Sequence, residues 1–259
     1  MSQESEKGHI HLTNRIIDEI VGIFVDIGFE VVTGPEMEDE YHNFDALNVP
    51  KDHPARDMQD TFWVEQMNLK PYLKDNRTGE SVLPQVLRTH TSNMQIRFAE
   101  THEPPFKIIV PGKVYRNENT DRTHEVQFHQ IEGMVIGKDI NLSHLKFALN
   151  NFIKKIFGDD VETQFRPGYF PFTEPSIEVD MKCFKCKGSG CSTCSHSGWI
   201  EILGSGMTHP NVLSSAGIDP NKYQGFAFGM GADRIAMLKY GVDDVRLLYN
   251  GDLRLTNQF

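Results

Sequence analysis

Residues 115–132 of this 259-residue chain combine side chains that could bind a phosphate and an amino group. Two strands joined by a charged loop are predicted here. Arg116 and Glu118 share one strand face, because strand side chains repeat every two residues, and Gln130 and Glu132 share a face of the second strand. A planar guanidinium suits a phosphate, and a carboxylate beside an amide suits an ammonium group. A solvated hairpin with surface ion pairs would explain these residues equally well.

A second candidate, residues 225–234, is a short strand rich in glycine and aromatic residues that leads into a Gly-x-Gly turn and a helix. Glycines let a backbone approach a ligand closely. Arg234 lies in the first helical turn, where it could face a phosphate or stack on a base. A tight strand-to-helix turn with a surface arginine is the plainer interpretation of this segment taken alone.

All four cysteines of the chain lie in one short segment, as two Cys-x-x-Cys pairs. Four thiolates form the closed tetrahedral set of structural zinc sites, which leaves no open position for catalysis. Gly188 and Gly190 permit a tight connection between the pairs, and His196 is predicted to be a bystander. We predict a zinc knuckle over residues 182–198, with four free thiols as the alternative. The predicted ligands are Cys183, Cys186, Cys191 and Cys194.

The order of the predicted helices and strands that must position these residues indicates an α+β fold. We expect a large, mainly antiparallel sheet flanked by helices. Few strands are separated by helices, unlike a doubly wound fold. Residues 1–9 are predicted to be a disordered tail, residues 10–259 one domain, residues 43–60 an ordered loop and residues 75–79 a hairpin turn. Helices are predicted over 10–29, 92–100, 142–157 and 231–240. Strands are predicted over 30–33, 61–64, 106–110, 113–116, 125–135, 163–167, 177–181, 199–203 and 226–228.

The net charge of −10 and pI near 5.5 argue against a protein that holds nucleic acid by charge alone. The polar first seven residues show no signal peptide, and no apolar run could span a bilayer. We therefore expect a cytoplasmic protein without a membrane partner. Clustered cysteines in a reducing compartment favour metal over disulfides.

The two polar stretches together resemble motifs 2 and 3 of class II aminoacyl-tRNA synthetases. Longer strings narrow the resemblance to the α-subunit family of phenylalanyl-tRNA synthetases, and it runs from about residue 10 to residue 259. These strings are long and unusual, so a chance match is not a serious competitor. They occupy residues 34–38, 43–48, 53–57, 60–63, 87–92, 169–175 and 206–212.

This resemblance implies a ligase that activates L-phenylalanine with ATP and transfers it to the 3′ end of tRNA(Phe). Arg116 would hold the α-phosphate of ATP and Glu118 its adenine end. Arg234 would pack against the nucleotide and reach the γ-phosphate. Glu174 resembles the magnesium-linked carboxylate of the family, and Glu201 is a second candidate.

For the amino acid, the resemblance implies an edge-to-face aromatic pocket made by Phe170 and Phe172, with Ala227 at its floor. Four polar side chains would hold the head group: His90, Ser92, Gln130 and Glu132. The expected cofactors are Mg²⁺ with ATP and a structural Zn²⁺, although the cysteine insertion occurs in only part of the family. The expected partner is a β subunit in an α2β2 assembly. In this family the β subunit carries the editing site.

Two departures from the family pattern stand out. Motif 3 usually has Glu before the arginine, where this chain has Asp233. The family also begins with a long helical hairpin that contacts tRNA, and only about nine residues precede the domain here, so we expect a trimmed or naturally short form. The chain ends where α subunits usually end, so no anticodon-binding domain is expected to follow.

Two other functions fit parts of the sequence. A stand-alone paralogue could form an adenylate for an acceptor other than tRNA, but the intact pocket of Phe170, Phe172 and Ala227 argues against it. A binding module built on the zinc knuckle, with the large domain inert, is the third hypothesis. Assays of amino-acid-dependent ATP–pyrophosphate exchange and of tRNA charging distinguish these three hypotheses.

Overall fold

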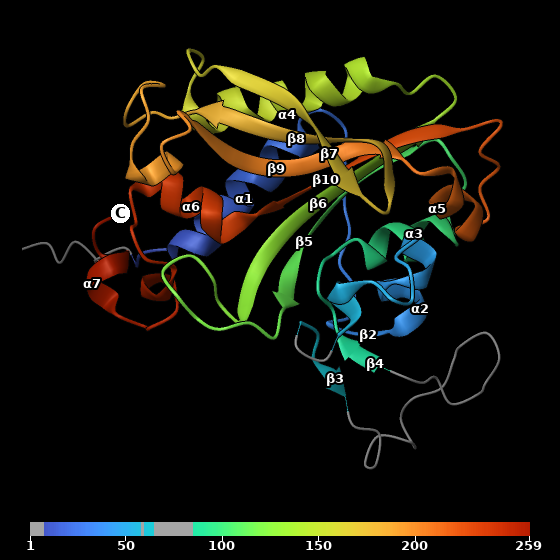
Figure 1. The fold of residues 1–259 in the computed structure, drawn as a ribbon, viewed down its shortest axis with the longest axis horizontal. Helices are drawn as coiled ribbons and strands as arrows, with labels where there is room; N and C mark the ends of the chain where they lie inside the picture. The colour runs from blue at the N-terminus through green and yellow to red at the C-terminus, as the bar shows by residue number, and fades with distance from the viewer. Residues whose placement is uncertain (1–7, 58–59, 65–84) are drawn as a thin grey trace, which may run out of the picture.

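A seven-stranded sheet forms the centre of the computed structural model, which describes residues 8–57, 60–64 and 85–259 (Figure 1). All neighbouring strands are antiparallel except β1 and β5, which confirms the predicted fold class. In sheet order the strands are β1 (Glu30–Val31), β5 (Phe106–Tyr115), β6 (Gln127–Gly137), β10 (Gln224–Gly231), β9 (Trp199–Thr208), β8 (Thr173–Lys182) and β7 (Thr163–Phe170).

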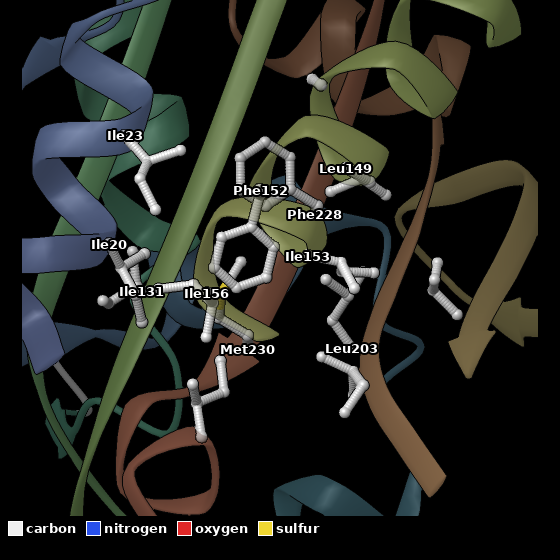
Figure 2. Packing of buried hydrophobic residues seen from close by; sticks show 14 of the residues in the cluster. Ile20, Ile23, Ile131, Leu149, Phe152, Ile153, Ile156, Leu203, Phe228 and Met230 are labelled. Atoms are coloured by element: carbon white, nitrogen blue, oxygen red, sulfur yellow. The ribbon is translucent and has the colours of Figure 1, made fainter. Parts of the chain in front are cut away.

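Two long amphipathic helices pack on one face of this sheet. Helix α1 (Leu12–Val25) buries Ile16, Ile20 and Phe24 completely, and α4 (Leu142–Phe157) covers the neighbouring strands. The Phe24 ring lies 4.8 Å from the Phe228 ring and 5.6 Å from the Phe152 ring, so one aromatic side chain joins α1, α4 and β10. Figure 2 shows this main core, which holds the strands that carry the candidate site.

A smaller sheet and several short helices form a second layer beside β5 (Figure 1). This sheet has the order β2 (Met37–Asp39), β4 (Gln85–Leu87) and β3 (Trp63–Val64). The other helices are α2 (Glu40–Asn43), α3 (Asn93–Ala99), α5 (Pro210–Ser215), α6 (Ala232–Tyr240) and α7 (Leu253–Thr256). The 3-10 turns are η1 (Asp45–Leu47), η2 (Pro54–Arg56), η4 (Ser192–Cys194) and η5 (Val245–Leu248).

The two strands predicted at 106–110 and 113–116 are one continuous strand, β5. Pro111 lies between the two predicted segments and cannot donate a ladder hydrogen bond. However, β1 pairs only with Ile108 and Ile109, so among the described residues β5 has no strand on that side at Pro111 and no donor is missed. Gly112 has no side chain because a Cβ there would lie 2.2 Å from the Arg88 guanidinium.

The stretch predicted as an ordered loop, residues 43–60, instead contains the end of α2 and the turns η1 and η2. Local polar caps stabilise these short elements: the Asp39 carboxylate accepts from the His42 backbone N–H at 2.8 Å, and His53 caps η2. Elements this short show no hydrophobic period. For the same reason β4, α5 and α7 were not predicted. The expected hairpin turn at 75–79 and most of the expected tail lie outside the described residues.

Candidate active site

Two cavities meet at Arg116 on the open face of the large sheet. One has a volume of about 380 Å³ and the other about 370 Å³. The first is lined by polar side chains, three phenylalanines and small residues, and the second by arginines, carboxylates and Phe128. The first cavity includes nine predicted site residues: His90, Ser92, Arg116, Gln130, Glu132, Phe170, Phe172, Glu201 and Ala227. The second includes Arg116, Glu118 and Arg234.

The Glu132 carboxylate is held at the inner wall of the first cavity. It accepts hydrogen bonds from the backbone N–H of Thr91 at 3.0 Å, from Ser92 Oγ, and from Gln95 Nε2 at 3.2 Å. Glu132 is only 4% exposed, and burial raises its pKa, although these hydrogen bonds and the charge of Arg116 oppose the shift. A fixed buried carboxylate of this kind can bind a cationic group that enters the cavity.

Two buried polar atoms of the same cavity lack a hydrogen-bond partner among the described residues. They are Nδ1 of His90 and Oε1 of Gln130. Burial, together with the charge of Arg116, lowers the pKa of His90 to about 4, so its ring is neutral at pH 7. Unpaired buried polar atoms are costly and usually indicate a missing partner. Beside Glu132 they favour a ligand that carries an ammonium group.

The apolar end of the first cavity is formed by Phe170 and Phe172. Their ring centroids lie 5.9 Å apart with an angle of 12° between the planes, so the two rings are nearly parallel to each other. Ala227, only 7% exposed, contributes its small side chain. Gly204 lies behind Phe170, where a Cβ would come within 2.7 Å of the ring. This end suits a flat apolar side chain.

The second cavity has a guanidinium on each side. The Arg116 guanidinium lies 5.0 Å from the centre of the Phe128 ring, and Arg234 projects from the first turn of α6. Burial lowers the pKa of both arginines, although nearby carboxylates oppose this. Among the described residues neither guanidinium forms an ion pair. Two charges without counter-ions suit an anionic ligand such as a phosphate chain.

Asp233 stands where motif 3 usually has Glu. It lines the second cavity and is also hydrogen-bonded to three other segments of the chain. Its buried carboxylate accepts from the His129 backbone N–H at 2.6 Å, Tyr249 Oη at 2.9 Å and Thr13 Oγ1 at 3.0 Å. Asp233 thus ties the start of α6, and with it Arg234, to β6, α1 and the C-terminal segment. Although this side chain is shorter than that of Glu, both of its carboxylate oxygens accept hydrogen bonds.

The two predicted magnesium residues lie in different surroundings. Glu201 lines the first cavity and a further cavity that reaches Arg234. Burial and the neighbouring carboxylates of Glu178 and Asp180 raise the pKa of Glu201, an arrangement that a divalent cation would relieve. Glu174 is exposed and is not among the residues that line these cavities. The role predicted for Glu174 stays a prediction without support from its position.

The four cysteines converge between β8 and β9, and all their sulfur atoms lie within 4.8 Å of one another. Three Sγ–Sγ distances are 3.7–3.8 Å, far longer than a disulfide bond. Zn–S bonds of about 2.3 Å give tetrahedral edges of about 3.8 Å, so the spacing fits zinc. Backbone N–H groups of Gly190 and Gly198 donate to the sulfurs of Cys186 and Cys194 at 3.2 and 3.3 Å, which favours thiolates. The cluster could therefore hold a metal ion.

A second group of possible metal ligands is already paired. Glu38 accepts from Arg97 and Asn93, and His42 lies between Asp39 and Glu100. Because these carboxylates are engaged, the group is a structural ion-pair network. It was not predicted from the sequence, since its members come from β2, α2 and α3.

The residues that line the site but were not predicted include Gln95, Phe128 and Gly204. Gln95 follows Ser92 by three residues on α3, so helical spacing could have placed both on one face. Phe128 alternates with Gln130 along β6, which was also a usable signal. Gly204 gave none, because its role depends on the position of Phe170 on β7.

Fold and site together define a class II synthetase catalytic domain. The whole chain, residues 1–259, matches the family model of the tRNA synthetases class II core domain (F), and the chain belongs to this family. The "Phenylalanine--tRNA ligase alpha subunit" of Macrococcus caseolyticus is 54% identical over 254 residues, covering 97% of this chain and 67% of the relative. The protein of the same name from Bacillus cytotoxicus is 53% identical over 256 residues, covering 98% and 70%.

A solved structure shares the fold at low identity. The crystal structure of pyrrolysyl-tRNA synthetase from Desulfitobacterium hafniense matches with a TM-score of 0.64 and 14% identity, over 93% of this chain and 74% of that one. At this identity the likeness shows the fold alone. Among the described helices, none has the length and apolarity needed to cross a membrane.

Proposed function

We propose that this chain is the catalytic α-type subunit of a phenylalanine–tRNA ligase, which activates L-phenylalanine with ATP and transfers it to tRNA(Phe). The observation that carries the proposal is the meeting of two cavities at Arg116. One offers a carboxylate, unpaired polar atoms and an aromatic end. The other offers two guanidinium groups that form no ion pair among the described residues. Names of the relatives support phenylalanine as the amino acid.

The chemistry follows from this arrangement. The carboxylate oxygen of phenylalanine attacks the α-phosphorus of ATP; the new O–P bond forms as the bond to pyrophosphate breaks. The attacking carboxylate is already ionised, so no protein base is needed. Arg116 would neutralise the charge that develops at the α-phosphate, and Arg234 would hold the remaining phosphates. A ribose hydroxyl at the tRNA 3′ end then attacks the carbonyl carbon, and AMP leaves.

Glu132, His90 and Gln130 would bind the ammonium group, which fixes the amino acid with its carboxylate toward Arg116. Phe170, Phe172 and Ala227 would receive the phenyl ring. Such a pocket rejects an added hydroxyl only weakly, so we expect proofreading of tyrosine at another site. The name "alpha subunit" of the relatives supports a β partner, and we propose an α2β2 assembly that works in the cytoplasm and carries the editing site on β.

Two metal ions belong to the proposal. Mg²⁺ would accompany ATP and supply positive charge to its phosphates, and Glu201 would hold it, with Glu178 and Asp180 nearby. Zn²⁺ would be held by Cys183, Cys186, Cys191 and Cys194. Four sulfurs fill its coordination sphere, so it would stabilise the knuckle without taking part in the reaction.

ATP–pyrophosphate exchange with each of the twenty amino acids tests the proposal, using the chain co-expressed with its β subunit. Phenylalanine should support the fastest exchange, and tyrosine should support measurable but slower exchange because the pocket rejects an added hydroxyl only weakly. The tRNA(Phe) should then be charged with phenylalanine. Exchange without tRNA charging would instead support an adenylate-forming paralogue. No exchange with any amino acid would overturn the proposal and favour a binding module built on the zinc knuckle.

A further inference from the structure

A fourth cavity, of about 630 Å³, lies between the cysteine knuckle and α6. It shares Thr123, Arg234 and Met237 with the cavity proposed for ATP, so the two are continuous. The loop between β5 and β6 contributes one wall through Arg122. The knuckle contributes the opposite wall through Phe184 and Lys185. Figure 1 shows the knuckle, in orange beyond β8 and β9, beside α6.

The cavity is cationic although the chain is acidic, with a net charge of −10. Arg122, Lys185 and Arg234 line it, and among the described residues none of the three forms an ion pair. The contact of Arg122 is with a backbone carbonyl, that of Asp243, at 3.3 Å. Asp243 is the single acidic side chain among the lining residues, so positive charge prevails.

An aromatic side chain beside these cations narrows the class of ligand. Phe184 is 50% exposed, and no described aromatic ring packs against it. Phe184 follows Cys183 directly, so a zinc ion bound by the four cysteines would fix its position in the cavity wall. Cations that follow a backbone and an aromatic ring that stacks a base are the means by which proteins bind single-stranded nucleic acid. A pyrophosphate would use the cations and leave the ring unused.

We infer that this cavity binds the single-stranded 3′ end of the RNA substrate, with a base stacked on Phe184 and a phosphate near Lys185. The inference rests on the proposed function and deepens it, because it assigns the knuckle a role in presenting RNA to the adenylate. It also explains how an acidic chain could hold RNA locally: the needed charge is concentrated at one cavity that opens into the reaction site.

The test uses the chain in complex with its β subunit and compares Phe184→Ala and Lys185→Gln with Lys187→Gln. Lys187 is an exposed lysine of the same knuckle that does not line the cavity, which makes it the matched control. The probes are a tRNA(Phe) transcript and pyrophosphate. Both cavity variants should raise the KM for tRNA in charging about tenfold, a loss expected for one stacked base or one phosphate contact. Exchange without tRNA should stay within about twofold of the parent.

Zinc content and thermal unfolding of each variant verify that the knuckle is intact. With Lys185→Gln the dependence of the tRNA KM on salt should also weaken, which a general loss of folding would not produce. A raised KM for pyrophosphate with an unchanged KM for tRNA would overturn the inference in favour of the leaving group. Unchanged constants throughout would overturn it too. If the parent complex itself charges no tRNA, the proposed function fails, and this is seen before any variant is compared.

Discussion

The Asp233 carboxylate on α6 accepts a 2.6 Å hydrogen bond from the backbone N–H of His129 on β6, a segment far away in the sequence. His129 precedes Gln130 of the amino-acid cavity, and Asp233 precedes Arg234 of the nucleotide cavity. This hydrogen bond extends the β6–β10 pairing, which ends at Gly231 and Gln130, and helps to hold the two halves of the site together. The other Asp233 oxygen accepts from Thr13, which ties both halves to α1.

Replacing Asp233 by Ala should lower the free energy of unfolding by about 3 kcal/mol or more, because buried donors on His129, Tyr249 and Thr13 would lose their acceptor. Tyr249→Phe removes one of these hydrogen bonds and should cost only about 1 kcal/mol. Urea denaturation measures both. The KM for ATP should rise more in the Ala variant than the KM for phenylalanine, since Arg234 follows Asp233 directly. Equal stability of the two variants would contradict this role of Asp233.

The sequence predicted the large elements and most of the site because both have short-range signals. The helix over 142–157 was predicted to the residue, and alternation correctly placed Gln130 and Glu132 together in the first cavity. The unpredicted parts depend on contacts between distant segments. Short elements such as β4 and α5 have too few residues for a period. Glu201 is a predicted magnesium candidate, but its position beside Glu178 and Asp180 depends on the pairing of β8 with β9.

The geometry of the aromatic pocket also could not be predicted from the sequence, because it depends on a distant residue. The string around Phe170 and Phe172 identified the residues, but their nearly parallel arrangement depends on the glycine of another strand. At Gly204 on β9 a Cβ would lie 2.7 Å from the Phe170 ring. No local pattern marks that glycine, because the ring that needs the space is on β7 and reaches it across β8.

Gly204→Ala should therefore displace the Phe170 ring into the cavity. We expect the KM for phenylalanine in the exchange assay to rise at least about tenfold, consistent with overpacking costs of about 1–3 kcal/mol, while the KM for ATP changes little. Gly22→Ala is the control, since nothing lies within 4 Å of a Cβ at that helical position.

The opposite change, Ala227→Gly, enlarges the same pocket and should admit para-halogenated phenylalanines. If Gly204→Ala left phenylalanine binding intact, the position given to Phe170 would be wrong. If Ala227→Gly left specificity intact, Ala227 would not border the substrate ring. The two variants act in opposite directions on one cavity, so a general loss of stability could not produce both results.

Cys191→Ser should abolish stoichiometric metal binding at the knuckle. The parent should hold one zinc per chain, measured by elemental analysis, and chelation should lower its melting temperature. Loss of a closed four-sulfur site removes the main constraint on a segment with few apolar contacts of its own. Lys187→Gln, in the same segment, should keep both zinc and stability. A parent with no bound metal and no response to a chelator would contradict the zinc assignment.

His90 should make folding stability depend on pH in a defined window. Its pKa is about 4 in the folded chain, against about 6.5 when unfolded, because burial and Arg116 disfavour the charged ring. Between these values the unfolded state binds more protons, so stability is complete above about pH 6.5 and falls as the pH drops toward 4. The loss attributable to His90 is up to about 3 kcal/mol. His90→Gln cannot titrate, so its unfolding free energy should fall less between pH 7 and pH 4 than that of the parent chain. Replacing the exposed His9 by Gln should leave the parent dependence unchanged, and parallel curves for His90→Gln and the parent would show that the His90 ring is not buried in the neutral form.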